Sequence, residues 1–154
     1  MLPDFPTADA PRKLKSVSDR LLAGLSSELK GPRVLVLLMH GTTLASAFRE
    51  SRPDLKFTFF TTEHFFYRTL QAFHADTMIT PDIVNIVCQS DLPEQEFDEI
   101  VFSTLSGDSS ELAQDLIQAA HQRLRSGGRL FAATNNPKDR WVQNQLKSLA
   151  ISRR

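Results

Sequence analysis

The fold is decided by the stretch from Arg33 to Phe48, RVLVLLMHGTTLASAF, in which an apolar run, a short turn and a helical pattern follow one another. The run RVLVLL (33–38) is continuously apolar after its first residue, as expected of a strand that is buried on both faces. From Thr43 apolar residues recur at helical spacing, and Pro53 lies just past the end of that helix. A buried strand that leads through a turn into a helix predicts a parallel α/β sheet.

Strand and helix patterns alternate along the rest of the chain. Further strands are predicted at 56–61, 83–88, 97–103 and 129–134, and further helices at 16–30, 63–73, 109–128 and 137–149. Only QSDLPEQE (89–96) joins the third and fourth strands, which is too short for a regular crossover helix. The alternation predicts a three-layer α/β sandwich around one parallel sheet.

Length and composition indicate one globular domain at 16–154, preceded by a loose, proline-containing arm at 1–15. The chain has 154 residues, and its 18 basic and 18 acidic side chains give a net charge of zero, unlike a strongly basic nucleic-acid binder. A local basic patch for RNA remains compatible with that charge. The single cysteine excludes an intrachain disulfide, and no metal-ligand spacing is present. Without an apolar leader or a membrane-length run, a cytoplasmic protein is expected.

Ligands of such sheets bind beyond the carboxyl ends of the strands. This rule alone selects the segments His40–Thr43, Thr61–His64, Gln89–Leu92 and Ser103–Ser106. A Ser–His–Asp triad is compatible with the composition, but no motif places its members.

From Val34 to Leu149 the chain resembles the class I S-adenosylmethionine-dependent methyltransferases, especially the group that includes ribosomal RNA guanine-N2 methyltransferases. ELAQDLIQAAHQRLRSGGRL (111–130) is similar to the family's helix, Leu-x-Pro-Gly-Gly turn and fifth strand, with Ser126 in place of the proline. FDEIVFS (97–103) is similar to its fourth strand. The resemblance implies a Rossmann-like sheet with strand order 3-2-1-4-5. The usual C-terminal strand pair is expected to be lacking, which would leave the fifth strand exposed to a protein partner or a second copy.

The resemblance implies S-adenosylmethionine as the cofactor. The family's signature is an acidic residue followed by Gly-x-Gly-x-Gly, whose glycines let backbone N–H groups approach the methionine part. Here Leu37 stands in place of the acid, Met39 and Thr43 replace two glycines, and Gly41 is the glycine that remains. The turn is therefore a degenerate version of the family's ligand loop.

The same resemblance implies five cofactor contacts. His40, Gly41 and Thr42 would face the methionine end, Glu63 the ribose and Asp91 the adenine. Three of these residues have a simpler interpretation. His40 would bond to the backbone of its turn, Glu63 would be an acid at a helix start, and Asp91 would be an ordinary turn residue.

Ser103 and Thr104 occupy the position where amino-methylating relatives carry Asn-Pro-Pro, so they are the predicted substrate contacts. Their hydroxyls accept hydrogen bonds but do not reproduce the rigid turn, which argues against base N-methylation by the usual mechanism. No catalytic base is assigned. Two functions stay open: a methyltransferase that acts on ribosomal RNA, and a non-catalytic binding or assembly module with the same fold.

Overall fold

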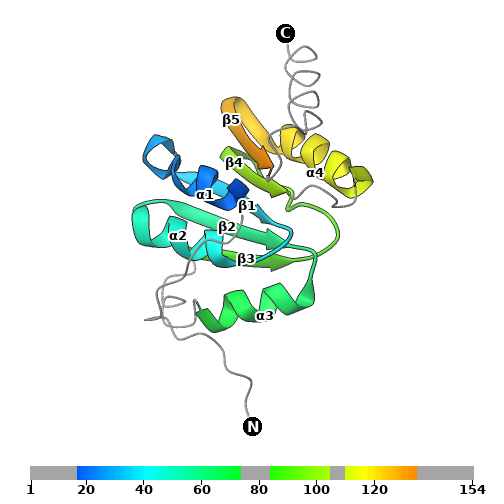
Figure 1. Ribbon diagram of the computed structural model, residues 1–154. Coiled ribbons are helices and arrows are strands. Elements are labelled where there is room, and N and C mark those ends of the chain that lie inside the picture. Colours follow the sequence, from blue (N-terminus) through cyan, green and yellow to red (C-terminus); the bar gives the residue numbers. More distant parts are fainter. Residues whose placement is uncertain (1–16, 74–83, 105–109, 135–154) are drawn as a thin grey trace.

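A computed structural model describes residues 17–73, 84–104 and 110–134 of the chain (Figure 1). Its helices are α1 (Val17–Ala23), the 3-10 turn η1 (Ser26–Glu28), α2 (Thr43–Ser51), α3 (His64–Phe73) and α4 (Ser110–Arg123). Its strands are β1 (Arg33–Leu38), β2 (Lys56–Thr61), β3 (Val84–Cys88), β4 (Phe97–Thr104) and β5 (Leu124–Thr134). The predicted arm at 1–15 and the predicted helix at 137–149 lie outside the described residues.

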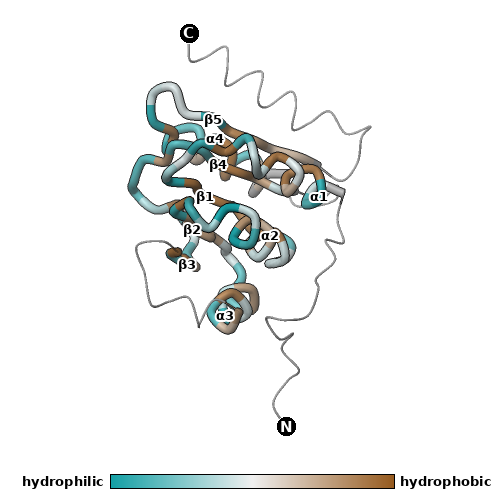
Figure 2. The backbone as a smooth tube through the Cα atoms, turned by 90° about the vertical axis from the view of Figure 1, so that its left-hand side faces the viewer, coloured by the Kyte–Doolittle hydropathy of each residue, from teal (hydrophilic) through white to brown (hydrophobic). Residues whose placement is uncertain are grey.

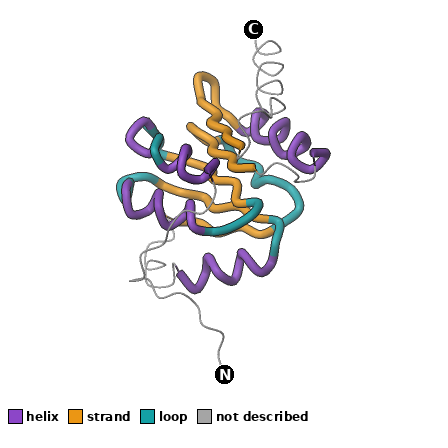
Figure 3. Tube along the Cα trace, in the orientation of Figure 1, coloured by secondary structure: helices purple, strands orange, loops and turns teal. Residues whose placement is uncertain are grey.

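The five strands form one sheet in the order β3-β2-β1-β4-β5, and every pairing is parallel. This confirms the predicted α/β fold and strand order. β1 lies at the centre, where Val36 pairs with Phe59 of β2 on one side and with Val101 of β4 on the other. All strands end at the same edge, termed here the carboxyl edge, and loops emerge there (Figure 3). The opposite edge is the amino edge.

Two hydrophobic cores fill the faces of the sheet. One lies under α1, α2 and α3, and the other lies under α4. Successive residues of β1 alternate between them, so that Val36 joins the first core and Leu37 the second. Figure 2 shows the hydrophobic colour concentrated in the sheet between the helices. No helix among the described residues is long and apolar enough to cross a membrane.

No helix forms between β3 and β4. Segment 89–96 returns from the carboxyl edge to the amino edge as turns and irregular chain. Leu92 is 3% exposed and packs into the core beside α4, where a crossover helix would otherwise lie. The short connection thus contributes one buried leucine to this core in place of a helix.

Two predicted boundaries were wrong. The first helix ends at Ala23 instead of continuing to residue 30, because Gly24 starts a turn and the chain re-forms only as η1. The helix predicted at 109–128 ends at Arg123, and β5 begins at Leu124, which pairs with Phe97. Leu124 is 7% exposed in the core beside α4, so its tertiary packing outweighs the helical pattern.

Two buried acids at the amino end of β4 bind the segments that surround it. Glu99 is 2% exposed, and its Oε1 accepts hydrogen bonds from the backbone N–H groups of Lys30 at 2.6 Å and Gly31 at 2.7 Å. Its other oxygen binds Arg129, which also donates to the carbonyl of Glu28. These contacts attach the chain before β1 to both β4 and β5.

Asp98, on the other face of β4, is 6% exposed. Its Oδ2 accepts a hydrogen bond from the backbone N–H of Arg33 at 2.9 Å, and its Oδ1 pairs with the guanidinium of Arg125. The two carboxylates are therefore satisfied by backbone N–H groups and arginines. They hold the amino edge of the sheet together.

Candidate functional site

The carboxyl edge gathers residues from separate elements around the turn between β1 and α2. Gly41 lies in this turn, and a Cβ built on it meets no atom of the described residues within 4 Å. Its backbone does not have a positive φ, so neither conformation nor packing requires glycine here. Open space beside the backbone of a strand–helix turn is what a ligand contact at this position needs.

A buried polar cluster lies next to this turn. It consists of Ser18 and Asp19 of α1, His40 of the turn and Ser103 of β4. Ser103 is its centre, because its Oγ lies 2.6 Å from Asp19 Oδ1, 3.0 Å from His40 Nε2 and 2.9 Å from Ser18 Oγ. Ser18, Asp19 and Ser103 are at most 5% exposed. The cluster connects three elements that are far apart in the sequence.

The donors and acceptors of this cluster can be assigned. A carboxylate only accepts, so the single proton of the Ser103 hydroxyl goes to Asp19. The two lone pairs of Oγ then accept from His40 Nε2–H and from the hydroxyl of Ser18, which uses the full capacity of the serine. His40 consequently carries a proton on Nε2.

The three residue types of a hydrolytic triad are present but in another order. In a triad the histidine separates the serine from the acid and takes the serine proton. Here the serine separates the acid from the histidine, and Asp19 Oδ1 is 3.9 Å from His40 Nε2. With its proton directed at Asp19 and an exposure of 2%, Ser103 is not arranged as a nucleophile.

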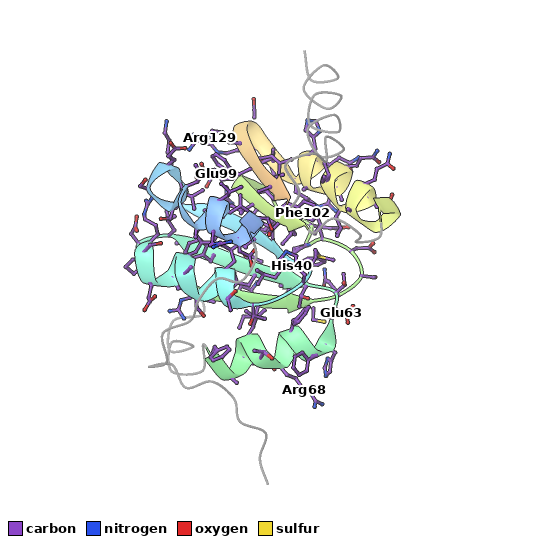
Figure 4. The ribbon with its side chains drawn as sticks, in the orientation of Figure 1. His40, Glu63, Arg68, Glu99, Phe102 and Arg129 are labelled. Atoms are coloured by element: carbon purple, nitrogen blue, oxygen red, sulfur yellow. The ribbon has the colours of Figure 1, made fainter. Side chains whose placement is uncertain are left out.

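The two acids predicted to bind the cofactor lie at the exposed carboxyl edge. Glu63 directly precedes α3, its carbonyl accepts the N–H of Tyr67, and its own N–H donates to Thr61 Oγ1 at 3.1 Å. Asp91 is exposed, and its backbone carbonyl accepts a hydrogen bond from Gln89 at 2.7 Å. Neither carboxylate has a recorded side-chain partner in the described residues, so both are available to a ligand. Figure 4 shows Glu63 and His40 away from Glu99 and Arg129, which lie at the amino edge.

The remaining predicted residues have different environments. Thr42 directly precedes α2 and is 8% exposed. Its side chain makes no capping hydrogen bond to the helix, so Thr42 contributes to the turn through its packing and its backbone. Ser103 is buried within the cluster, and Thr104 ends β4, with its side chain outside the described residues. The simpler interpretation of His40 was wrong, because its ring binds a serine side chain and not the backbone of its turn.

Neither Asp19 nor Ser18 was identified from the sequence as a site residue. The sole signal was an acid at the start of a helix that precedes the first strand, which is also common in ordinary helices. Their role depends on contacts with Ser103 across 84 and 85 residues of sequence. No local pattern reports contacts of that range.

Three solved structures illustrate what this fold is similar to. TrmN from Thermus thermophilus superposes with a TM-score of 0.66 and 19% identity, over 92% of this chain and 44% of that one. The [4+2]-cyclase SpnF superposes with a TM-score of 0.61 and 22% identity, over 87% of this chain and 57% of that one. The third structure is the O-methyltransferase NcsB1 from neocarzinostatin biosynthesis, solved with S-adenosyl-L-homocysteine and 1,4-dihydroxy-2-naphthoic acid. It superposes with a TM-score of 0.55 and 17% identity, over 74% of this chain and 38% of that one.

No protein-family model and no curated protein matches the sequence. The chain spans 38% to 57% of the length of the three solved structures, whose low identities bear on the fold alone. One of the three is described as a cyclase, so this fold also supports other chemistry. The strand order and these superpositions together establish that the chain has the Rossmann-like fold of the class I methyltransferases.

Proposed function

We propose that the protein binds S-adenosylmethionine at the carboxyl edge and transfers its methyl group. The observation that carries the proposal is the open space at Gly41, in the strand–helix turn of a sheet with methyltransferase strand order. The exposed carboxylates of Glu63 and Asp91 lie beyond the next two strands at the same edge. A turn that admits a ligand and acids on neighbouring loops together fit a molecule that carries a ribose and an adenine.

Each residue has a proposed role. The backbone at Gly41 and Thr42 contacts the methionine end together with His40. Glu63 accepts hydrogen bonds from the ribose hydroxyls, which suits a carboxylate because it can accept two at once. Asp91 accepts a hydrogen bond from the adenine amino group. The cofactor supplies a methyl group on a positively charged sulfur, and the chain contributes binding and orientation.

Ribosomal RNA as the substrate belongs to the same proposal. Its support is the resemblance of residues 111–130 to the RNA-modifying group. A protein partner or a second copy at the β5 edge also stays a prediction, as does a cytoplasmic location. The alternative is a non-catalytic binding or assembly module. It differs from the enzyme in one measurable way, because a module would not transfer a methyl group.

Calorimetric titration with S-adenosylmethionine and S-adenosylhomocysteine tests the proposal. We expect dissociation constants in the micromolar range. Loss of the ribose contact in Glu63→Gln should weaken binding about tenfold, the size expected for a hydrogen bond to a charged group. Glu50→Gln is the matched control, since Glu50 is exposed near the end of α2, away from the carboxyl edge. Absence of binding at millimolar ligand would refute the proposal.

A further inference from the structure

One ring nitrogen of His40 has no polar contact with the described residues. Within the described residues, both of its recorded polar contacts, to Ser103 and to Asp19, involve Nε2. The side chain is 11% exposed, so the ring is mostly buried but not sealed. Since Nε2 carries the proton, Nδ1 bears a lone pair and can act as an acceptor.

A chain of hydrogen bonds holds the ring through its other nitrogen. Asp19 accepts from Ser103, and Ser103 accepts from His40, so the three groups form a chain from carboxylate to imidazole. A proton taken up at Nδ1 makes the ring cationic. Asp19 Oδ1 lies 3.9 Å from Nε2 of that ring.

The position of His40 relates this chemistry to the proposed cofactor site. His40 directly precedes Gly41, and its partner Ser103 is opposite Leu38 where β1 and β4 end. These strands lie side by side at the centre of the sheet. A group bound at this point of the carboxyl edge would be next to the histidine.

From these observations we propose that His40 is the general base of the reaction, that Asp19 and Ser103 position it, and that the methyl acceptor is a hydroxyl group. The inference rests on the proposed function. The acceptor oxygen forms a bond to the methyl carbon while the bond between sulfur and that carbon breaks. The electron pair of the broken bond stays on sulfur. The hydroxyl proton goes to Nδ1 of His40. Solvent removes that proton afterwards.

A hydroxyl acceptor fits this arrangement better than an exocyclic amine. Hydroxyl groups hold their proton at neutral pH, the phenol of tyrosine having a pKa of about 10, so their oxygen gains nucleophilicity when a base takes the proton. An imidazole with an accepting nitrogen supplies that base. An amine oriented by carbonyl acceptors would need such groups at the end of β4, where this chain has Ser103 and Thr104.

The first test determines the protonation of His40 without requiring activity. Long-range proton–nitrogen correlation spectra of the ¹⁵N-labelled full chain above pH 8 distinguish the two neutral forms of each of the four histidines. His40→Gln identifies the signal. We expect the Nε2–H form at His40, and Ser103→Ala should shift it toward a mixture. A His40 with its proton on Nδ1 would overturn the proposal, because that nitrogen could then not accept a proton.

The second test uses ribosomal RNA, which carries both ribose hydroxyls and exocyclic amines, and catechol as a small hydroxyl acceptor. His40→Gln retains an N–H donor for Ser103 but lacks the base. We expect the wild-type protein to methylate oxygen. The rate of that transfer should fall about a hundredfold or more in His40→Gln. Calorimetry measures S-adenosylmethionine binding by the same variant, and we expect the loss of methyl transfer at saturating cofactor to exceed any loss of affinity. His64→Gln on the exposed start of α3 is the control.

The outcomes separate the two proposals. If the wild-type protein does not bind the cofactor, the proposed function fails, whatever the state of His40. If the cofactor binds but the methyl group goes to nitrogen, or His40→Gln transfers it to oxygen as fast as the wild type, the assignment of His40 fails alone. If neither probe is methylated, the protonation state of His40 decides.

Discussion

The two ends of β4 differ in how they use buried polar side chains. At the amino end Asp98 and Glu99 are surrounded by arginines and backbone N–H groups that satisfy them. At the carboxyl end a neutral serine joins an acid to a histidine that retains an accepting nitrogen. Both ends attach the N-terminal part of the chain to the sheet, and the second also contains the histidine for which we propose a catalytic role.

This difference indicates which buried charges belong to the fold and which belong to a site. A carboxylate whose partners all come from the protein contributes to stability or specificity of the fold. A histidine that is held through one nitrogen only can still exchange a proton through the other. Removing groups at each end should therefore give separable effects on stability and on ligand chemistry.

The largest effect is expected at the amino end. Glu99→Ala leaves Arg129 without its buried partner and two backbone N–H groups without an acceptor. Because Arg129 is 39% exposed, most of the cost comes from the two N–H groups, and at about 1–3 kcal/mol for each unsatisfied donor the loss of unfolding free energy should be about 2–6 kcal/mol. Urea unfolding followed by circular dichroism measures it, with the exposed Glu50→Ala as control. Equal unfolding midpoints for the two variants would contradict a structural role for Glu99.

A smaller loss of stability is expected at the carboxyl end. Ser103→Ala removes the hydroxyl that bonds to Asp19, His40 and Ser18, and its cost should be about 1–3 kcal/mol, the range for buried polar groups left unsatisfied. Ser90→Ala, at an exposed position of the β3–β4 loop, is the matched control. Should Ser103→Ala unfold at the same urea concentration as that control, the cluster is not part of the stable fold.

Two glycines sharpen the comparison, because one lies at each edge. Gly31 has φ +55°, and a Cβ there would be 2.5 Å from Leu55 Cδ2, so Gly31→Ala should cost at least about 1–2 kcal/mol of unfolding free energy. Gly41→Ala meets no atom and should leave stability unchanged. It should instead weaken S-adenosylmethionine binding in calorimetry. The reverse pattern, a destabilised Gly41→Ala with normal affinity, would remove the cofactor assignment.

The smallest effect concerns an exposed ion pair near the amino edge. A side-chain hydrogen bond from Arg52 holds the pKa of Asp54 below its ordinary value of 3.8. Its contribution to stability is therefore present above that value and is lost as the pH falls through the lower, folded-state pKa. Thermal melts of wild type and Asp54→Asn should differ slightly at neutral pH and converge in acid. A difference that grows on acidification would have the wrong sign.

Local patterns predicted most of the sheet. The bounds of β1 and β2 agree with the prediction because their apolar runs are continuous and are followed by clear helix starts. The strand order came from family resemblance. Patterns failed at Gly24 and Leu124, where one glycine and one buried leucine ended helices that periodicity alone would have continued.

The candidate site was predictable only in its location. The carboxyl-edge rule selected the segments that contain His40 and Ser103, because it depends on topology. It could not show that these side chains bond to each other or that Asp19 joins them from a helix before β1. Such contacts depend on the packing of three elements, which the sequence does not report residue by residue.

The insertion of β4 beside β1 has a consequence for the moment at which this site forms during synthesis. The ribosome releases α1, β1, β2 and β3 before β4, and early pairings can join β1 to β2 and β2 to β3. Ser103, which bonds to Ser18, Asp19 and His40, is synthesised only with β4, and its contacts close long loops. A nascent chain stalled before β4 can therefore hold part of its sheet but not the polar cluster.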